Sequence, residues 1–175
     1  MWYMIEFLHC FSDSADATRR IGERLGELCV GGEVLLLSGD LGAGKTCFVQ
    51  GLARGLGIPE EWPVTSPTFV LHNQYQGRLR LDHIDFYRLM ETGSDKNSLS
   101  RKILDGLGLD DIWGASDGVC AVEWPEVFDL QGDTNSIRIR FYSEDDSPSH
   151  RKIEFRTAAE SHEKIIQKLL SLITQ

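Results

Sequence analysis

The chain of 175 residues has the length of one domain, and its 41% hydrophobic and 26% charged residues are typical of a globular protein. Its formal net charge of −9 argues against a protein that grips nucleic acid by itself, because such proteins usually present a basic face. No apolar run approaches the roughly 18 residues of a membrane span, and the N-terminus lacks a signal peptide's early Lys or Arg. We therefore expect one cytoplasmic domain over residues 1–175.

The four cysteines and five histidines are scattered without the close spacing of a zinc site. Cytosolic thiols normally stay reduced. We therefore interpret the cysteines as small buried hydrophobic residues, which applies to Cys10, Cys29, Cys47 and Cys120.

The first third of the chain predicts strands that alternate with helices. Ile21, Leu25 and Leu28 recur at helical spacing behind cap-type residues, and Gly57 with Pro59 stops a second helical stretch. The predicted elements are a strand over 1–11, a helix over 14–29, a fully buried strand over 33–38 and a helix over 44–56.

The rest of the chain predicts short strands separated by polar segments. Pro63 and Pro67 fix an extended loop, and alternating polar and apolar residues over 78–87 predict a half-exposed antiparallel strand, more typical of a sheet edge. The other predicted elements are a strand over 68–75 that forms a hairpin with it, a polar then helical stretch over 90–113, a buried strand over 118–124, an antiparallel pair over 136–146 and 149–158 around a turn at 147–148, and an amphipathic helix over 160–174.

The clearest motif is a phosphate-binding loop between the second strand and the second helix. The pattern G-x-x-x-x-G-K-[ST] is satisfied by Gly39, Asp40, Leu41, Gly42, Ala43, Gly44, Lys45 and Thr46. Glycines let the backbone curl so that successive N–H groups point at phosphate oxygens, and the following helix adds its positive end. Lys45 places a charge between the β- and γ-phosphates, and the Thr46 hydroxyl is a ligand for Mg²⁺. The motif predicts that the chain binds a nucleotide.

Two carboxylates are candidates for the acidic group that a phosphate-loop protein supplies from a neighbouring buried strand. Glu123 ends the apolar run 119–122, which has the form of such a strand, and Asp85 ends the alternating segment. We predict that Glu123 lies near the metal and Asp85 near the γ-phosphate or its water. Trp124 either packs at the nucleotide site or fills the core.

The favoured nucleotide is ATP, since no Asn lies in the N-K-x-D segment that guanine readers usually carry. The segments after Tyr87 hold only scattered Arg88 and Arg101, without the arginine-rich lid that small-molecule kinases on this fold usually carry. Ser66 and Thr68 offer hydroxyls on either side of Pro67, which predicts a switch loop.

Several segments together resemble the TsaE (YjeE) family, the bacterial ATPases of tRNA threonylcarbamoyladenosine biosynthesis. They occur in the family's order over about the first 130 residues. The matching segments are ATRRIGERLGEL (17–28), the phosphate loop with its helix (37–57), VTSPTFVLHNQY (64–75), HIDFYRL (83–89), GLDDIW (108–113) and VEWPE (122–126).

This resemblance implies a P-loop NTPase-like, three-layer α/β domain whose central sheet mixes parallel and antiparallel strands and is flanked by helices. It implies that Lys45 and Thr46 bind phosphate and Mg²⁺ and that Glu123 joins the metal shell. It further implies that Asp85 lies beside the triphosphate and is needed for activity.

The same resemblance implies that the SPTF loop, with Ser66 and Thr68, behaves as a switch. It places the base of ATP against the segment before the first helix, from Asp13 to Ala15. One departure is Cys47, where the family often has a second Thr after the essential one. Another is a longer polar stretch over 93–102, which bears on how a partner docks.

The function implied is a Mg²⁺-dependent ATPase required for N6-threonylcarbamoyladenosine at position 37 of tRNAs that read ANN codons. It would dock on the TsaD–TsaB pair, which holds the tRNA, and hydrolysis would reset that complex. Hydrolysis by the chain alone should be slow, because a switch gated by a partner must not run idly. The alternatives are a P-loop kinase of a small molecule and a module that uses ATP only as a structural ligand.

Overall fold

A seven-stranded mixed sheet organises the computed structural model, which describes residues 8–90, 106–128, 135–144 and 147–173. The strands are β1 (Leu8–Ser12), β2 (Val34–Ser38), β3 (His72–Tyr75), β4 (Arg80–Asp85), β5 (Gly118–Glu123), β6 (Ile137–Glu144) and β7 (Ser147–Arg156). Their order in the sheet is β1-β7-β6-β2-β5-β4-β3. The pairs β2–β5, β2–β6 and β4–β5 are parallel, whereas β1–β7, β6–β7 and β3–β4 are antiparallel. The expected mixed sheet is therefore confirmed.

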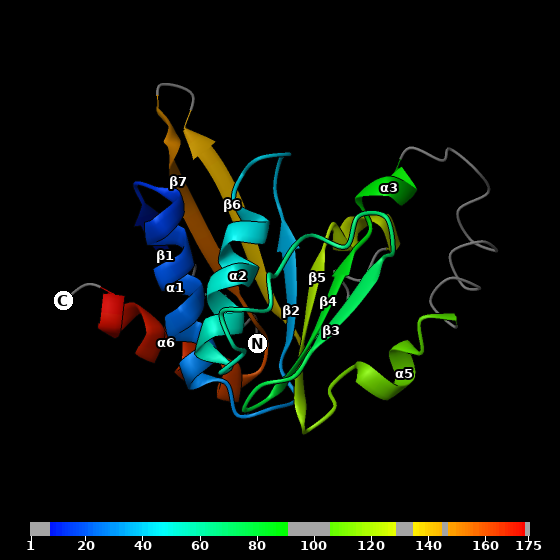
Figure 1. The fold of residues 1–175 in the computed structure, drawn as a ribbon. Helices are drawn as coiled ribbons and strands as arrows, with labels where there is room; N and C mark the ends of the chain where they lie inside the picture. The colour runs from blue at the N-terminus through cyan, green and yellow to red at the C-terminus, as the bar shows by residue number, and fades with distance from the viewer. Residues whose placement is uncertain (1–7, 91–105, 129–134, 145–146, 174–175) are drawn as a thin grey trace, which may run out of the picture.

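Helices cover one face of the sheet as a layer, and Figure 1 shows α1 and α2 side by side in front of the half of the sheet that contains β1, β7 and β6. The helices of this layer are α1 (Ala15–Leu28), α2 (Lys45–Gly55) and α6 (Glu160–Ile173). Their apolar sides meet alternate strand residues in the main core, where Leu25, Leu37 and Phe48 are fully buried. Glycine allows the close approach of the first two helices, because a Cβ on Gly51 would lie 1.8 Å from the Arg19 carbonyl oxygen.

A second, smaller core lies on the opposite face of the central strands. It contains Leu36, Phe86 and Val122, which are buried against partly buried apolar residues of the segments that cover them. The short elements on this side are α3 (Tyr87–Met90), α5 (Leu109–Ile112) and the 3₁₀ turn η1 (Pro125–Phe128). Because β2 and β5 are covered on both faces, both carry continuous apolar runs, residues 34–37 in β2 and 119–122 in β5, as expected for buried parallel strands.

Most predicted elements are confirmed, with differences at their ends. The helix predicted over 14–29 begins after Ser14, whose side chain accepts a hydrogen bond from the Ala17 N–H. Of the first predicted strand the structure describes residues 8–11, and the stretch 93–102 lies outside the described residues. The turn predicted at 147–148 is wrong, since β7 already includes both residues. No helix within the described ranges is long and apolar enough to cross a membrane.

The interpretation of residues 78–87 as a half-exposed edge strand is wrong. The hairpin exists, but β3 is the edge strand and β4 lies between β3 and β5. Residues 81–85 are all buried, although Asp82, His83 and Asp85 are polar. Their polarity reflects buried hydrogen-bond partners rather than contact with water.

Candidate functional site

The phosphate loop connects the end of β2 to the first residue of α2. Gly44 caps this helix with φ of 102°, a conformation that favours glycine. Lys45 is only 4% exposed, and its ammonium donates to the carbonyl oxygens of Gly39 at 2.7 Å and Asp40 at 2.9 Å. The loop is therefore folded around its own lysine.

The backbone of this loop leaves donors available for an anion. The N–H groups of Leu41, Gly42 and Gly44 donate to no acceptor within the described parts of the chain, while the N–H of Ala43 bonds to Asp40 at 3.1 Å. The positive end of α2 lies at the same point. Unused donors at a helix N-terminus fit a phosphate group.

Trp124 lies on the lysine of the loop. The Lys45 ammonium is 3.9 Å from the centroid of its ring, a cation–π contact. The ring also lies 5.0 Å from that of Tyr87, and it packs against the second core. Trp124 therefore contacts the lysine of the phosphate loop and also packs against the core, so each of the two alternatives for this residue describes part of its position. Its φ of 61° is unusual for a residue with a side chain.

Thr46, in the first turn of α2, contacts Glu123, the last residue of β5. Glu123 ends β5, directly opposite Leu37 of β2. The Thr46 hydroxyl donates to Glu123 Oε1 at 3.0 Å and lies 3.2 Å from Oε2. His83 Nε2 lies 2.9 Å from the same Oε1, so the carboxylate is held between a hydroxyl and an imidazole.

Asp85 ends β4 at the register position opposite Glu123. Its Oδ2 accepts hydrogen bonds from the hydroxyls of Ser66 and Thr68, the latter at 2.8 Å, and the two hydroxyls are 2.8 Å apart. Its Oδ1 accepts from the Tyr87 N–H at 2.8 Å. The structure therefore ties residues 66–68 to the strand end that carries Asp85.

The pKa of Lys45 is lowered by burial of its ammonium, although nearby carboxylates, chiefly Glu123 and Glu126, act in the opposite direction. Burial disfavours the charged form of the lysine, and the neighbouring carboxylates offset that effect only in part. A phosphate oxygen next to the ammonium would favour its charged form.

The segment predicted to contact the base, Asp13 to Ala15, follows β1 and is connected to the phosphate loop through β7. Ser12 pairs with Arg151 of β7, and Arg151 Nε donates to the Ala43 carbonyl at 2.9 Å. Asp13 to Ala15 follow Ser12 directly, and Asp13 Oδ1 accepts from the Ser14 hydroxyl at 3.0 Å. The segment is thus connected to the loop through Arg151.

Sequence reasoning assigned no role to His83 or Arg151. His83 lies inside the quoted HIDFYRL segment, so its spacing of two residues from Asp85 was the available signal. Arg151 lies beyond the last recognisable motif and reaches the loop only through strand pairing. Nothing in the local sequence marks it.

Thr46 and Glu123 are the residues that fit a Mg²⁺ ion. Magnesium usually takes few protein oxygens and completes its shell with water and phosphate. A hydroxyl and a carboxylate oxygen beside a phosphate loop match that donor set. Within the described residues, no group of three or more His, Cys, Asp or Glu side chains is placed to hold a metal.

Comparison with known proteins gives a consistent result. Residues 12–153 match the family model described as threonylcarbamoyl adenosine biosynthesis protein TsaE. The tRNA threonylcarbamoyladenosine biosynthesis protein TsaE of Treponema pallidum is 45% identical over 119 residues, covering 68% of this chain and 79% of that protein. The protein of the same name from Bacillus subtilis is 34% identical over 155 residues, covering 88% of each chain.

A solved structure agrees with these matches over almost the whole chain. The crystal structure of YdiB from Bacillus subtilis superimposes with a TM-score of 0.76 at 30% identity, covering 97% of this chain and 98% of that one. The chain therefore belongs to the TsaE family, whose members are named as tRNA threonylcarbamoyladenosine biosynthesis proteins.

Proposed function

We propose that this chain is a Mg²⁺-dependent ATPase that acts in N6-threonylcarbamoyladenosine modification of tRNA, at position 37 of tRNAs reading ANN codons. The observation that carries the proposal is the contact between Thr46 of the phosphate loop and Glu123 at the end of β5. Phosphate-loop NTPases hold their metal between a loop hydroxyl and an acidic group on a neighbouring strand. The family membership supports the pathway.

The loop residues bind and orient the triphosphate. The N–H groups of the loop would donate hydrogen bonds to the phosphate oxygens, and the Lys45 ammonium would leave the carbonyls of Gly39 and Asp40 to contact the same oxygens. Thr46 and Glu123 would hold the metal, with His83 fixing the carboxylate. When bound, Mg²⁺ neutralises charge that develops between the β- and γ-phosphates.

Asp85 is proposed to orient the attacking water. A carboxylate beside the γ-phosphate position can accept a proton from water, provided that its oxygens are available. In this structure, the hydroxyls of Ser66 and Thr68 both bind its Oδ2. A switch in which these hydroxyls move towards the nucleotide would release that oxygen, so loop position and hydrolysis would be coupled.

The proposed partners are TsaD and TsaB, with tRNA held by that complex. Exposed apolar side chains flank the site, which supports docking of a protein there. Leu41 at the tip of the phosphate loop is 73% exposed, and Val70 beyond Thr68 is 63% exposed. Docking against these residues would place a partner where it can move the 66–68 segment.

The test is ATP hydrolysis by the purified chain, first alone and then with TsaB and TsaD of the same organism. We expect a slow basal rate that rises strongly only with both partners and that vanishes in Lys45→Ala. A rate that the partners leave unchanged would contradict the proposal and would favour a kinase, to be sought by adding metabolites.

A matched pair of variants tests docking separately. Val70→Asp should lose stimulation by the partners while keeping the basal rate. Val30→Asp makes the same change at a 76% exposed valine beyond the end of α1, and it should keep both. Equal stimulation of both variants would show that docking lies elsewhere.

A further inference from the structure

One half of the sheet carries no described helix on one of its faces. In β6, every second side chain from Ile137 to Phe141 belongs to the main core under α1, α2 and α6. Strand alternation turns the side chains between them to the opposite face. There the second core covers the other central strands but includes no residue of β6, β7 or β1 among those described. We call this side the open face, comprising Arg138, Arg140, Tyr142, Lys152, Glu154 and Arg156.

Strand register arranges the open face in rows. Arg140 lies opposite Glu154, Tyr142 lies opposite Lys152, and the third row pairs two arginines, one from each strand. Edge strand β1 extends two of the rows, with His9 opposite Glu154 and Phe11 opposite Lys152. Aromatic and basic side chains therefore alternate over three adjacent strands.

The charge of the open face opposes that of the whole chain. It holds four cationic side chains and one carboxylate, on a protein whose net charge is −9. Glu154 accepts hydrogen bonds from Lys152 at 2.7 Å, Tyr142 at 3.0 Å and Arg156 at 3.3 Å, so it is already shared. The Arg140 guanidinium is exposed, contacts no carboxylate of the described residues, and lies 5.2 Å from the Tyr142 ring.

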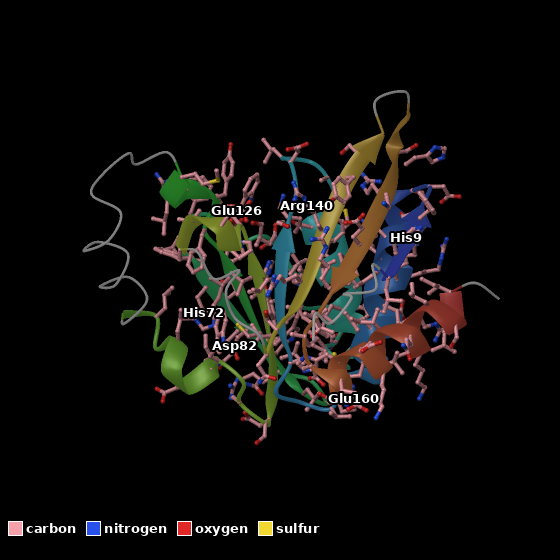
Figure 2. The ribbon with its side chains drawn as sticks, turned by 180° about the vertical axis from the view of Figure 1, so that it is seen from behind. His9, His72, Asp82, Glu126, Arg140 and Glu160 are labelled. Atoms are coloured by element: carbon pink, nitrogen blue, oxygen red, sulfur yellow. The ribbon has the colours of Figure 1, made fainter. Side chains whose placement is uncertain are left out.

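The open face continues into a hollow beside the phosphate loop. This hollow has a volume of about 340 Å³ and is lined by arginines of β6 and β7 on one side and by Gly39, Asp40 and Glu126 on the other. Figure 2, which views the sheet from behind, shows Arg140 between Glu126 and His9. Strand pairing sets Arg140 opposite Ser38, the residue before the loop.

We propose that the open face binds single-stranded RNA directly, with a backbone phosphate on Arg140 and bases stacked on Tyr142 and Phe11. Open sheets that present aromatic rings among cations are suited to unpaired bases, which stack on the rings while arginines take the phosphates. Phe11 is 64% exposed, and stacking of a base on its ring would remove part of this apolar surface from water. An acidic protein partner would form ion pairs with the cations of this face but would not need its exposed aromatic rings. The inference goes beyond the proposed function, in which a partner alone holds the RNA.

The test is fluorescence polarisation of a labelled RNA single strand of about ten nucleotides, a length within the range that such surfaces bind. Binding is measured without ATP, so the result tests RNA binding even if the chain proves not to hydrolyse ATP. Arg140→Ala should reduce the slope of log affinity against log salt by about 0.7, the value of one phosphate contact on a single strand. Tyr142→Ala should weaken binding at least about fivefold, and Tyr142→Phe, which keeps the ring, should retain it.

Arg54→Ala is the charge-matched control, because Arg54 lies on α2, which covers the opposite face, and pairs with Glu60. It should leave both affinity and slope within about twofold of the wild type. Equal effects of Arg54→Ala and Arg140→Ala would overturn the proposal, since only net charge would then matter. A poly-glutamate peptide that competes as well as RNA, with no effect of Tyr142→Ala, would overturn it in favour of an acidic protein partner.

Discussion

His83 Nε2 lies 2.9 Å from the Glu123 oxygen that also accepts the Thr46 hydroxyl. The imidazole is completely buried, and its Nδ1 has no hydrogen-bond partner among the described residues. Because Nε2 faces a carboxylate oxygen, which can only accept a hydrogen bond, we infer that this nitrogen carries an N–H. The ring therefore fixes the orientation of the carboxylate from behind.

Replacement of His83 by Asn should raise the Mg²⁺ concentration for half-maximal hydrolysis by about 10- to 100-fold, the usual cost of losing a group that orients a metal ligand. The measurement is a magnesium titration of the ATPase rate. His72→Asn is the matched control, since His72 Nε2 also lies 2.9 Å from a buried carboxylate, that of Asp82, outside the site. A similar magnesium shift in both variants would contradict the positioning role.

Replacement of Asp85 by Asn should lower the hydrolysis rate by about 100-fold or more, because an amide cannot accept the proton of water as a carboxylate does. ATP affinity should change little, since the amide oxygen can still accept the Tyr87 N–H. Single-turnover hydrolysis and equilibrium binding of ATP separate the two effects. A variant that loses binding and hydrolysis in parallel would show that Asp85 only supports the nucleotide.

Replacement of Gly51 by Ala should destabilise the fold by about 1–3 kcal/mol, the usual cost of overpacking. Its Cβ would lie 1.8 Å from the Arg19 carbonyl oxygen, so the two helices must separate. This cost exceeds the gain of up to about 1 kcal/mol in helix propensity. Urea unfolding measures it, with Gly106→Ala as control, because no atom lies within 4 Å of a Cβ there. Equal stability of the two variants would contradict tight packing of α1 on α2.

Asp82 should make the fold sensitive to acid. Burial raises the pKa of Asp82, but hydrogen bonds from His72, Gln74 and Arg80 outweigh it and hold the pKa below its ordinary value of 3.8. Because the folded pKa lies below the unfolded one, the stabilisation is present above about pH 4 and is lost as pH falls through the folded pKa. Urea unfolding at decreasing pH should show a steeper loss in the wild type than in Asp82→Asn. Parallel curves would assign the acid sensitivity to other groups.

The sequence was sufficient to predict those parts of the site that depend on a short motif or on a single strand. The loop from Gly39 to Thr46 follows from its glycines and lysine, and Glu123 from its place at the end of an apolar strand. The buried strand β4 was misjudged, because polar residues in an alternating segment normally indicate an exposed face, whereas here each has a buried partner. Pairing between distant strands decides such cases, and no local pattern records it.

Arg151 illustrates the same limit from the other end of the chain. It supports the loop at Ala43 from β7, a strand whose position beside β6 and β1 depends on the whole sheet order. An isolated arginine in a segment without a motif gives no sign of that contact. The open face was missed for the same reason, since its cations belong to separate strands and the overall charge is negative.

The central position of β2 has a consequence for how the chain is made. Its two neighbours, β5 and β6, lie roughly 85 and 100 residues later in the sequence, so the strand that carries the phosphate loop has no sheet partner until those strands exist. Contacts between such distant segments form slowly and require the intervening chain. A ribosome must therefore synthesise the chain at least as far as β5 before β2, and the loop that follows it, gains its first sheet partner.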